Sequence, residues 1–138
     1  MSAVLTPGVR FQGATYVGIC TAANGSLYAL LLLDDKPAKR LGWNAAMAWA
    51  ESRHASLPTR PEAALLYALL PHKLEKSWHW TSETCSWDAS YAWDCNFTSG
   101  YQLLSHKSYE GSAAAVRRLP LESFNSLIDL AQGIEVRA

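Results

Sequence analysis

The sequence predicts an α+β fold, in which two helices flank a short-stranded, mainly antiparallel sheet. Three observations lead to this prediction. Two apolar runs near the N-terminus are separated by a turn that contains Asn24-Gly25, a dipeptide typical of β-hairpins. Residues 43–70 then follow a helical period. Beyond them, four of the six tryptophans lie between Trp78 and Trp93, in short alternating aromatic segments that are typical of strands.

The first hairpin is predicted over residues 11–20 and 26–33. Its second run is apolar on both faces, which is typical of a central strand. The sequence Asp34-Asp35-Lys36-Pro37 then interrupts the apolar run. We therefore expect the hairpin to end there, and a polar loop to extend from residue 36 to residue 42.

Two helices follow this loop. Alanine-rich sequence favours helix, and helical spacing places Trp43, Met47 and Ala50 on one stripe. Thr59 and Glu62 have the spacing of a capping box, in which each side chain binds a backbone N–H at the start of a helix. The predicted bounds are 43–54 and, before a proline that stops the second helix, 59–70.

The aromatic segments predict the remaining strands. Alternation in the first places both of its tryptophans on one face and His79 on the opposite face, toward solvent. In the next, Tyr91, Trp93, Cys95 and Phe97 share one face. The predicted strand bounds are 78–80, 91–97, 101–104 and 113–119.

Length and composition indicate one domain with little charge. Residues 1–120 are predicted to form the domain, and residues 121–138, with a weak helical pattern, a C-terminal tail. Only 17% of the residues are charged, which indicates a large core or apolar surface kept for a partner. The 12 basic and 12 acidic residues cancel without a run of one sign. This balance argues against a general nucleic-acid binder.

Targeting features predict an intracellular protein or a virion component. The N-terminus lacks the basic stretch and apolar core of a secretion signal. The longest apolar run, 27–33, is too short to span a bilayer. Three cysteines, an odd number, fit a reducing compartment better than a disulfide framework. Pairing of Cys85 with Cys95 across a hairpin stays an open alternative.

Several short motifs, taken in order over about residues 10–119, resemble a known family. They are Leu57-Pro58-Thr59, Trp80-Thr81-Ser82-Glu83, Ala92-Trp93 with Asn96-Phe97, and Val116-Arg117-Arg118. This order is similar to the phage and bacterial family called domain of unknown function 1566, which includes the C-terminal domain of the Legionella collagen-like adhesin. The resemblance implies a C-type-lectin-like fold with an aromatic loop region. That fold serves lectins, phage receptor-binding proteins and formylglycine-generating enzymes, so it does not fix the function.

No cofactor and no metal is predicted. Calcium-dependent lectins of this fold hold the ion through Glu-Pro-Asn and Trp-Asn-Asp motifs. This chain has no Glu-Pro-Asn, and the middle asparagine is missing at Trp93-Asp94. Its four histidines and three cysteines include no Cys-x-x-Cys or His-x-x-x-His pair of the kind that binds zinc.

No enzymatic activity is predicted either. Formylglycine-generating enzymes use two nearby cysteines, and Cys85 and Cys95 are the only candidates here, in sequence that does not resemble the motif of those enzymes. His79 has no Ser, Cys or Asp partner that spacing identifies. Glu83 and Arg117 are interpreted as structural residues. They either take part in a structural ion pair, or the Glu83 carboxylate holds loop N–H groups.

The loop around Trp87, between two predicted strands, is the strongest candidate for a binding site. A tryptophan in such a polar loop either packs back on the core or stands exposed, and exposed aromatic side chains anchor interfaces. The predicted partner-binding residues are Trp87, Asp88, Tyr91, Tyr101, His106 and Tyr109.

The predicted function is therefore binding without catalysis. We expect a phage- or prophage-encoded protein of the bacterial host cytoplasm that engages a host protein through its aromatic loops. An inhibitor of bacterial defence, such as an anti-CRISPR protein, is the sharpest form of this hypothesis. Two alternatives stay open: a virion adhesin that recognises a host glycan or surface protein, and an oxidase related to the formylglycine-generating enzymes. Self-association into a homo-oligomer also stays open.

Overall fold

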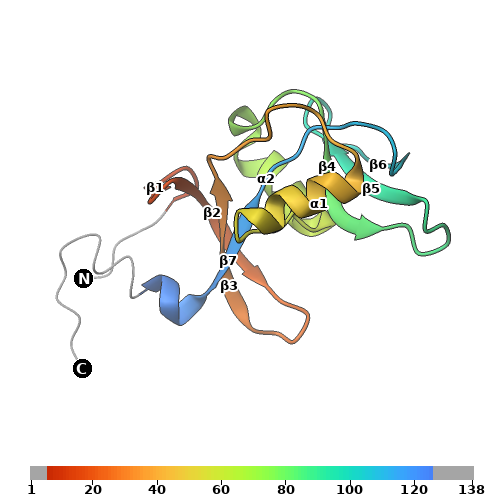
Figure 1. Ribbon diagram of the computed structural model, residues 1–138. Helices are drawn as coiled ribbons and strands as arrows, with labels where there is room; N and C mark the ends of the chain where they lie inside the picture. The colour runs from red at the N-terminus through yellow and green to blue at the C-terminus, as the bar shows by residue number, and fades with distance from the viewer. Residues whose placement is uncertain (1–5, 126–138) are drawn as a thin grey trace.

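A computed structural model of the protein describes residues 6–125 and confirms the α+β class. Within these residues the strands form two antiparallel sheets, where the sequence predicted one. The first sheet has the order β1-β2-β3-β7, and the second has the order β4-β5-β6. Figure 1 shows the four-stranded sheet at the left and the three-stranded sheet at the right, with helices α1 and α2 between them.

The four-stranded sheet confirms the predicted first hairpin and its central strand, because every residue from Ala29 to Leu33 is buried. The first predicted strand is divided in two. Gln12 and Gly13 both have positive φ, which makes a tight two-residue turn whose twist suits a hairpin. The strands are β1 (Arg10–Phe11), β2 (Ala14–Thr21), β3 (Leu27–Leu33) and β7 (Val116–Pro120).

Both predicted helices are present, as α1 (Trp43–Ser52) and α2 (Arg60–Leu69). The predicted capping box is confirmed, since the Thr59 hydroxyl accepts the N–H of Glu62 at 3.3 Å and the Glu62 carboxylate accepts the N–H of Thr59 at 2.8 Å. A short 3₁₀ helix, η1 (Pro71–Lys73), follows where the proline stops α2.

The three-stranded sheet consists of β4 (Trp78–Thr84), β5 (Tyr91–Asn96) and β6 (Gln102–His106). The predicted solvent position of His79 is wrong, because this side chain is only 4% exposed. Its ring packs edge-on against Phe97, with the ring centroids 4.9 Å apart. Both faces of β4 and β5 carry buried residues, and those of β5 include Ala92 and Asp94, opposite the face that the sequence predicted for Tyr91, Trp93 and Cys95.

The first tryptophan of β4, Trp78, packs half-buried against the core, and the second, Trp80, belongs to it. Trp80 is fully buried, and its indole N–H donates to the carbonyl oxygen of Leu41 at 2.8 Å. Trp78 contacts Trp80 edge-on, which confirms that the two rings share a face. Gly111 lies directly against the Trp78 ring, because a Cβ atom at this position would lie 2.3 Å from that ring.

The first residues after β7 also join the core. Residues 121–125 are helical, and Phe124 is buried against Phe11 and Tyr16 of the four-stranded sheet. The rest of the predicted tail, residues 126–138, lies outside the described residues.

The state of the cysteines and the length of the helices bear on two predictions made from the sequence. Cys20, Cys85 and Cys95 are all free, so the alternative disulfide across the hairpin does not form. Between residues 6 and 125, no helix has the length and apolar character needed to cross a membrane.

Candidate functional site

The pairing of β5 with β6 sets the position of the candidate binding residues. Tyr91 lies opposite His106, and Trp93 lies opposite Leu104. Side chains of directly opposed residues project from the same face of a sheet. Further along this face His79 and Cys95 are buried, whereas Tyr91, Trp93 and His106 are only half-buried. The end of the sheet near the β4–β5 loop therefore leaves aromatic rings open to solvent.

Trp87 extends this open end. It lies in the loop between β4 and β5, and 73% of its surface is exposed. One edge of its indole meets Trp93 at 6.3 Å between ring centroids and an interplanar angle of 81°. Asp88 shapes the loop, since its carboxylate accepts the N–H of Ser90 at 2.9 Å and its carbonyl oxygen accepts the N–H of Tyr91 at 3.1 Å. Trp87 is therefore presented to solvent by a hydrogen-bonded turn.

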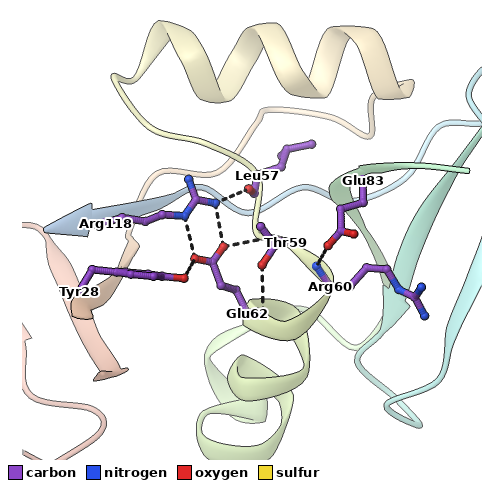
Figure 2. A network of polar contacts seen from close by, with 7 residues as sticks. All are labelled: Tyr28, Leu57, Thr59, Arg60, Glu62, Glu83 and Arg118. Carbon is purple, nitrogen blue, oxygen red and sulfur yellow. Dashed lines mark hydrogen bonds and ion pairs between the residues drawn. The ribbon is translucent and has the colours of Figure 1, made fainter. Parts of the chain in front are cut away.

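Arg60, the first residue of α2, holds the other side of Trp93. Its guanidinium carbon lies 3.6 Å from the centroid of a Trp93 ring, a cation–π contact. Arg60 Nε donates to Gln102 Oε1 at 2.9 Å, and the Gln102 amide donates back to the Arg60 carbonyl oxygen at 2.8 Å. The backbone N–H of Arg60 donates to the Glu83 carboxylate at 2.6 Å (Figure 2). Of the two structural roles predicted for Glu83, the structure shows a carboxylate that holds a backbone N–H, and this N–H belongs to the first residue of α2 instead of a loop.

A second aromatic group lies beside the first. The His106 ring meets Tyr91 edge-on, with centroids 5.3 Å apart, and Tyr109 at 6.1 Å. The N–H of Ser108 donates to His106 Nδ1 at 3.2 Å, and its hydroxyl lies 2.7 Å from the same atom. These contacts fix the imidazole, while Tyr109 remains 62% exposed.

We call the five rings of these two aromatic groups the aromatic surface. It unites four of the six predicted partner-binding residues with Trp93, which was not among them. Its members are Trp87, Tyr91, Trp93, His106 and Tyr109.

The other two predicted residues have different positions. Asp88 is exposed at the edge of the aromatic surface, where it supports the turn. Tyr101 is 70% exposed, but strand alternation with Gln102 places Tyr101 and Leu103 on the opposite face of the sheet. Tyr101 therefore belongs to a separate exposed site.

Sequence reasoning missed the contribution of Trp93 and Arg60 to this surface. Alternation placed Trp93 on one face with Tyr91, Cys95 and Phe97, but it does not show which part of that face is covered. Arg60 reaches the surface from a helix that begins far earlier in the chain, and no local signal connects it with Trp93 or Gln102.

Apart from the aromatic surface, a polar cluster joins the first turn of α2 to the four-stranded sheet (Figure 2). Glu62 is 2% exposed. One carboxylate oxygen accepts from the Tyr28 hydroxyl at 2.6 Å and from Arg118 Nε at 2.7 Å. The other accepts from Arg118 Nη2 at 2.7 Å and from the Thr59 N–H at 2.8 Å. We call these four residues the Glu62 cluster.

The Glu62 cluster is built for structure. Burial alone would raise the pKa of Glu62, but hydrogen bonds from Arg118, Tyr28 and Thr59 outweigh it and hold the pKa below its ordinary value. The carboxylate is therefore ionised at neutral pH and surrounded by four donors. Such a group has little remaining capacity to act as a base on a substrate.

Arg117, the neighbour of Arg118, also has the structural role that its sequence position predicted. Its guanidinium donates to the carbonyl oxygens of Arg53 at 2.7 Å and His54 at 3.2 Å, just after α1. The partners are backbone carbonyl groups instead of a carboxylate. Arg117 thereby ties the end of α1 to β7.

Of the residues considered for chemistry, His79 and Cys95 lie directly opposite each other in β4 and β5, and both are buried. Across residues 6–125, no group of three His, Cys, Asp or Glu side chains could hold a metal ion. Cys85 and Cys95 are both buried, and burial raises the pKa of the Cys95 thiol. Reactive cysteines have a lowered pKa and some exposure, so Cys95 has neither property of a nucleophile.

Comparison with known proteins does not identify the chain. No protein-family model matches its sequence, and no curated protein matches it. The resemblance to domain of unknown function 1566 therefore depends on the motifs quoted above.

Proposed function

We propose that this chain is a non-catalytic binding protein whose aromatic surface engages a protein partner. The observation that carries the proposal is the exposure of Trp87 and Tyr109, each in contact with a group of rings on the same face of the three-stranded sheet. Tryptophan and tyrosine bury large areas at low conformational-entropy cost, and they dominate the binding energy of protein interfaces. Arginine is the third residue type enriched there, and Arg60 lies beside Trp93.

The proposed mode of binding follows from the support beneath each ring. Trp93 is held between Arg60 and Trp87, and His106 is held between Tyr91 and Tyr109. The rings are therefore positioned before a partner arrives, which lowers the entropy lost on association. Trp87 enters an apolar pocket on the partner, and Tyr109 with the rim residue Asp88 supplies polar contacts around it.

The biological role that we propose is inhibition of a host factor by a phage- or prophage-encoded protein, in the manner of an anti-CRISPR protein. This part of the proposal is supported by the motif resemblance to a family with phage members. It also agrees with the low charge of the chain, which leaves few charged groups to desolvate at an interface. The C-type-lectin-like fold belongs to the same proposal and has the same support.

The test is affinity capture from bacterial lysate with the tagged full chain, followed by identification of the captured protein and measurement of its affinity. Trp87→Ala is expected to weaken that affinity by about 30-fold or more, the effect of losing a central interface residue. Leu27→Ala is the matched control, because Leu27 is an exposed apolar residue on the other sheet. Equal affinity for the wild type and Trp87→Ala would contradict the proposal.

A glycan-binding adhesin is the second candidate, and one observation favours it. Trp93 lies beside hydrogen-bonding groups of Arg60 and Gln102, and sugar recognition combines an aromatic face with neighbouring polar groups. A glycan array separates the two candidates. Binding of a glycan that Trp87→Ala abolishes, together with an empty protein capture, would replace the first proposal by the second.

A further inference from the structure

A cavity of about 240 Å³ lies between the loop after β3 and the start of β4. The loop contributes Lys36, Lys39 and Arg40 to its wall. Glu75, His79 and Ser112 line the other side. None of these residues belongs to the aromatic surface, so the cavity is a separate feature of the molecule.

Charge in the cavity departs from that of the whole chain. Three cations face one carboxylate, a net charge of +2, although the chain as a whole has a formal charge of zero. The single carboxylate, Glu75, lies 3.8 Å from Arg40. In a neighbouring cavity that shares Lys36, the other charged residues cancel as two cations and two anions: Arg10, Lys73, Asp34 and Asp35. The positive charge is therefore concentrated in the first cavity.

His79 lines this cavity, and its ring contains one hydrogen-bond acceptor. Its Nδ1 lies 3.1 Å from the carbonyl oxygen of Ser77, and a carbonyl only accepts, so Nδ1 carries the proton. Burial lowers the pKa of His79 to about 4, with a smaller contribution from Lys36 and Arg40. The ring is therefore neutral at pH 7, and its Nε2 offers a lone pair. This atom has no hydrogen-bond partner among residues 6–125.

The cavity wall is fixed by hydrogen bonds within the protein. Leu41, directly after Arg40, exchanges two backbone hydrogen bonds of 2.9 Å with Gly111. The next residue, Ser112, bonds through its backbone to β4 and donates its hydroxyl to Glu75 at 3.2 Å. The Ser77 hydroxyl lies 2.7 Å from the same oxygen of Ser112. The cationic loop and the buried wall are thus held together without a ligand.

We propose that this cavity binds a small phosphate monoester that carries a free hydroxyl group. The phosphate accepts hydrogen bonds from Lys36, Lys39 and Arg40, and the ligand hydroxyl donates to His79 Nε2. A phosphate monoester carries about −1.5 to −2 charges at neutral pH, which matches the +2 of the wall better than a single carboxylate does. The volume lies below the usual 300–1,000 Å³ of sites for drug-sized ligands, so the ligand has only a few carbon atoms.

The test uses the full chain and three probes: glycerol 3-phosphate, inorganic phosphate and glycerol. Titration calorimetry is expected to show the tightest binding for glycerol 3-phosphate, weaker binding for inorganic phosphate and none for glycerol. Failure of glycerol 3-phosphate to bind at millimolar concentration would overturn the site. Equal affinity for inorganic phosphate would overturn the role assigned to the hydroxyl.

Variants of exposed lysines test the geometry without disturbing the core. Lys36→Gln and Lys39→Gln are each expected to weaken glycerol 3-phosphate binding by about tenfold, the effect of one charged hydrogen bond. Lys76→Gln is the matched control, because Lys76 is exposed next to Glu75 but does not line the cavity. Equal weakening by Lys76→Gln would show general charge attraction and overturn the site.

His79 is buried, so its role is measured in the unaltered protein. The ¹⁵N resonance of His79 Nε2 is expected to shift when glycerol 3-phosphate binds, and to shift less with inorganic phosphate. An unchanged Nε2 resonance at saturation would overturn the assigned acceptor. None of the varied lysines belongs to the aromatic surface. Failure of phosphate binding would therefore leave the proposed protein binding at that surface unaffected, and the reverse also holds.

Discussion

Arg60 and Glu62 are two residues apart in the first turn of α2, yet they serve two regions with opposite character. Glu62 points toward the four-stranded sheet, where Tyr28 and Arg118 donate to its carboxylate (Figure 2). Thr59, the N-cap residue of α2, donates its backbone N–H to the same carboxylate. Arg60 points to the three-stranded sheet, where it stacks on the half-buried Trp93. The Glu62 cluster surrounds a buried carboxylate with polar groups, whereas the aromatic surface leaves apolar rings open to solvent.

Stability and binding depend on different regions of this molecule. A buried charge is tolerated only when donors surround it, so the Glu62 cluster is expected to contribute strongly to folding. An exposed ring contributes little to folding, because it buries little area when the chain folds. Variants of the first region should therefore change stability, and variants of the second should change binding.

The largest effect is expected from Arg118→Leu. This change leaves the Glu62 carboxylate buried without its cationic partner, and should lower the free energy of unfolding by about 3 kcal/mol. Urea unfolding measures it. Arg117→Leu is the matched control, since Arg117 bonds only to backbone carbonyls and should cost about 1 kcal/mol. Equal losses of unfolding free energy in the two variants would show that the ion pair of Arg118 with Glu62 contributes no more to stability than the backbone hydrogen bonds of Arg117.

Stability is also expected to fall in mild acid through His79. Its folded pKa of about 4 lies below the value near 6.5 of an unfolded chain, so the unfolded state binds more protons in that interval. Stability is therefore fully present above pH 6.5 and is lost as the pH falls toward 4, with about 2 kcal/mol lost at pH 5. His79→Gln should remove this dependence between pH 7 and 5. A wild-type unfolding free energy that is the same at pH 7 and pH 5 would contradict the buried, neutral ring.

Glu62 adds a second loss at lower pH. Its folded pKa lies below the unfolded value of about 4.3, so its contribution is present above that pH and disappears as the pH falls through the folded pKa. Glu62→Gln should flatten the stability curve below pH 4 while leaving the interval between pH 6.5 and 5 unchanged. Unfolding curves at half-unit steps separate the two groups.

An intermediate effect is expected from Gly111→Ala. The added Cβ would meet the Trp78 ring at 2.3 Å, so the ring must move within the β4 core, at a cost of about 2 kcal/mol. In Gly18→Ala the nearest atom lies at 3.6 Å, an ordinary contact, and the change should be close to neutral. Thermal unfolding compares the pair. An unchanged unfolding free energy in Gly111→Ala would show that the Trp78 ring can move away from residue 111 without cost, and would contradict its firm packing against Trp80.

The smallest effect on stability is expected from Trp87→Ala. The ring is mostly exposed and meets the fold through one edge against Trp93, so its removal should change the unfolding free energy by less than about 0.5 kcal/mol. Urea unfolding beside Arg118→Leu checks it. A loss as large as that of Arg118→Leu would place Trp87 with the structural residues.

Local sequence signals predicted the parts of the fold that depend on neighbours along the chain. The hairpin turn, both helices and the capping box of Thr59 and Glu62 each depend on a few adjacent residues, and all are present. The Trp87 loop was predicted for the same reason. Its signal, one tryptophan in a polar loop, is contained in the six residues 85–90.

Relations between distant segments could not be predicted in this way. Arg118 meets Glu62 across 56 positions, and Arg60 meets Gln102 across 42. The division into two sheets, the burial of His79 and the separation of Tyr101 from the other aromatic residues all depend on such packing. Alternation shows which side chains share a face of a strand, but it does not show what covers that face.

The most direct test of the account measures binding and stability together in Trp87→Ala/Tyr109→Ala. We expect this double variant to keep the unfolding free energy of the wild type within about 1 kcal/mol and to lose the captured protein partner. The variant Arg118→Leu, assayed at a temperature where it remains folded, should show the reverse. Retention of the partner by a folded Trp87→Ala/Tyr109→Ala would contradict the assignment of binding to the aromatic surface.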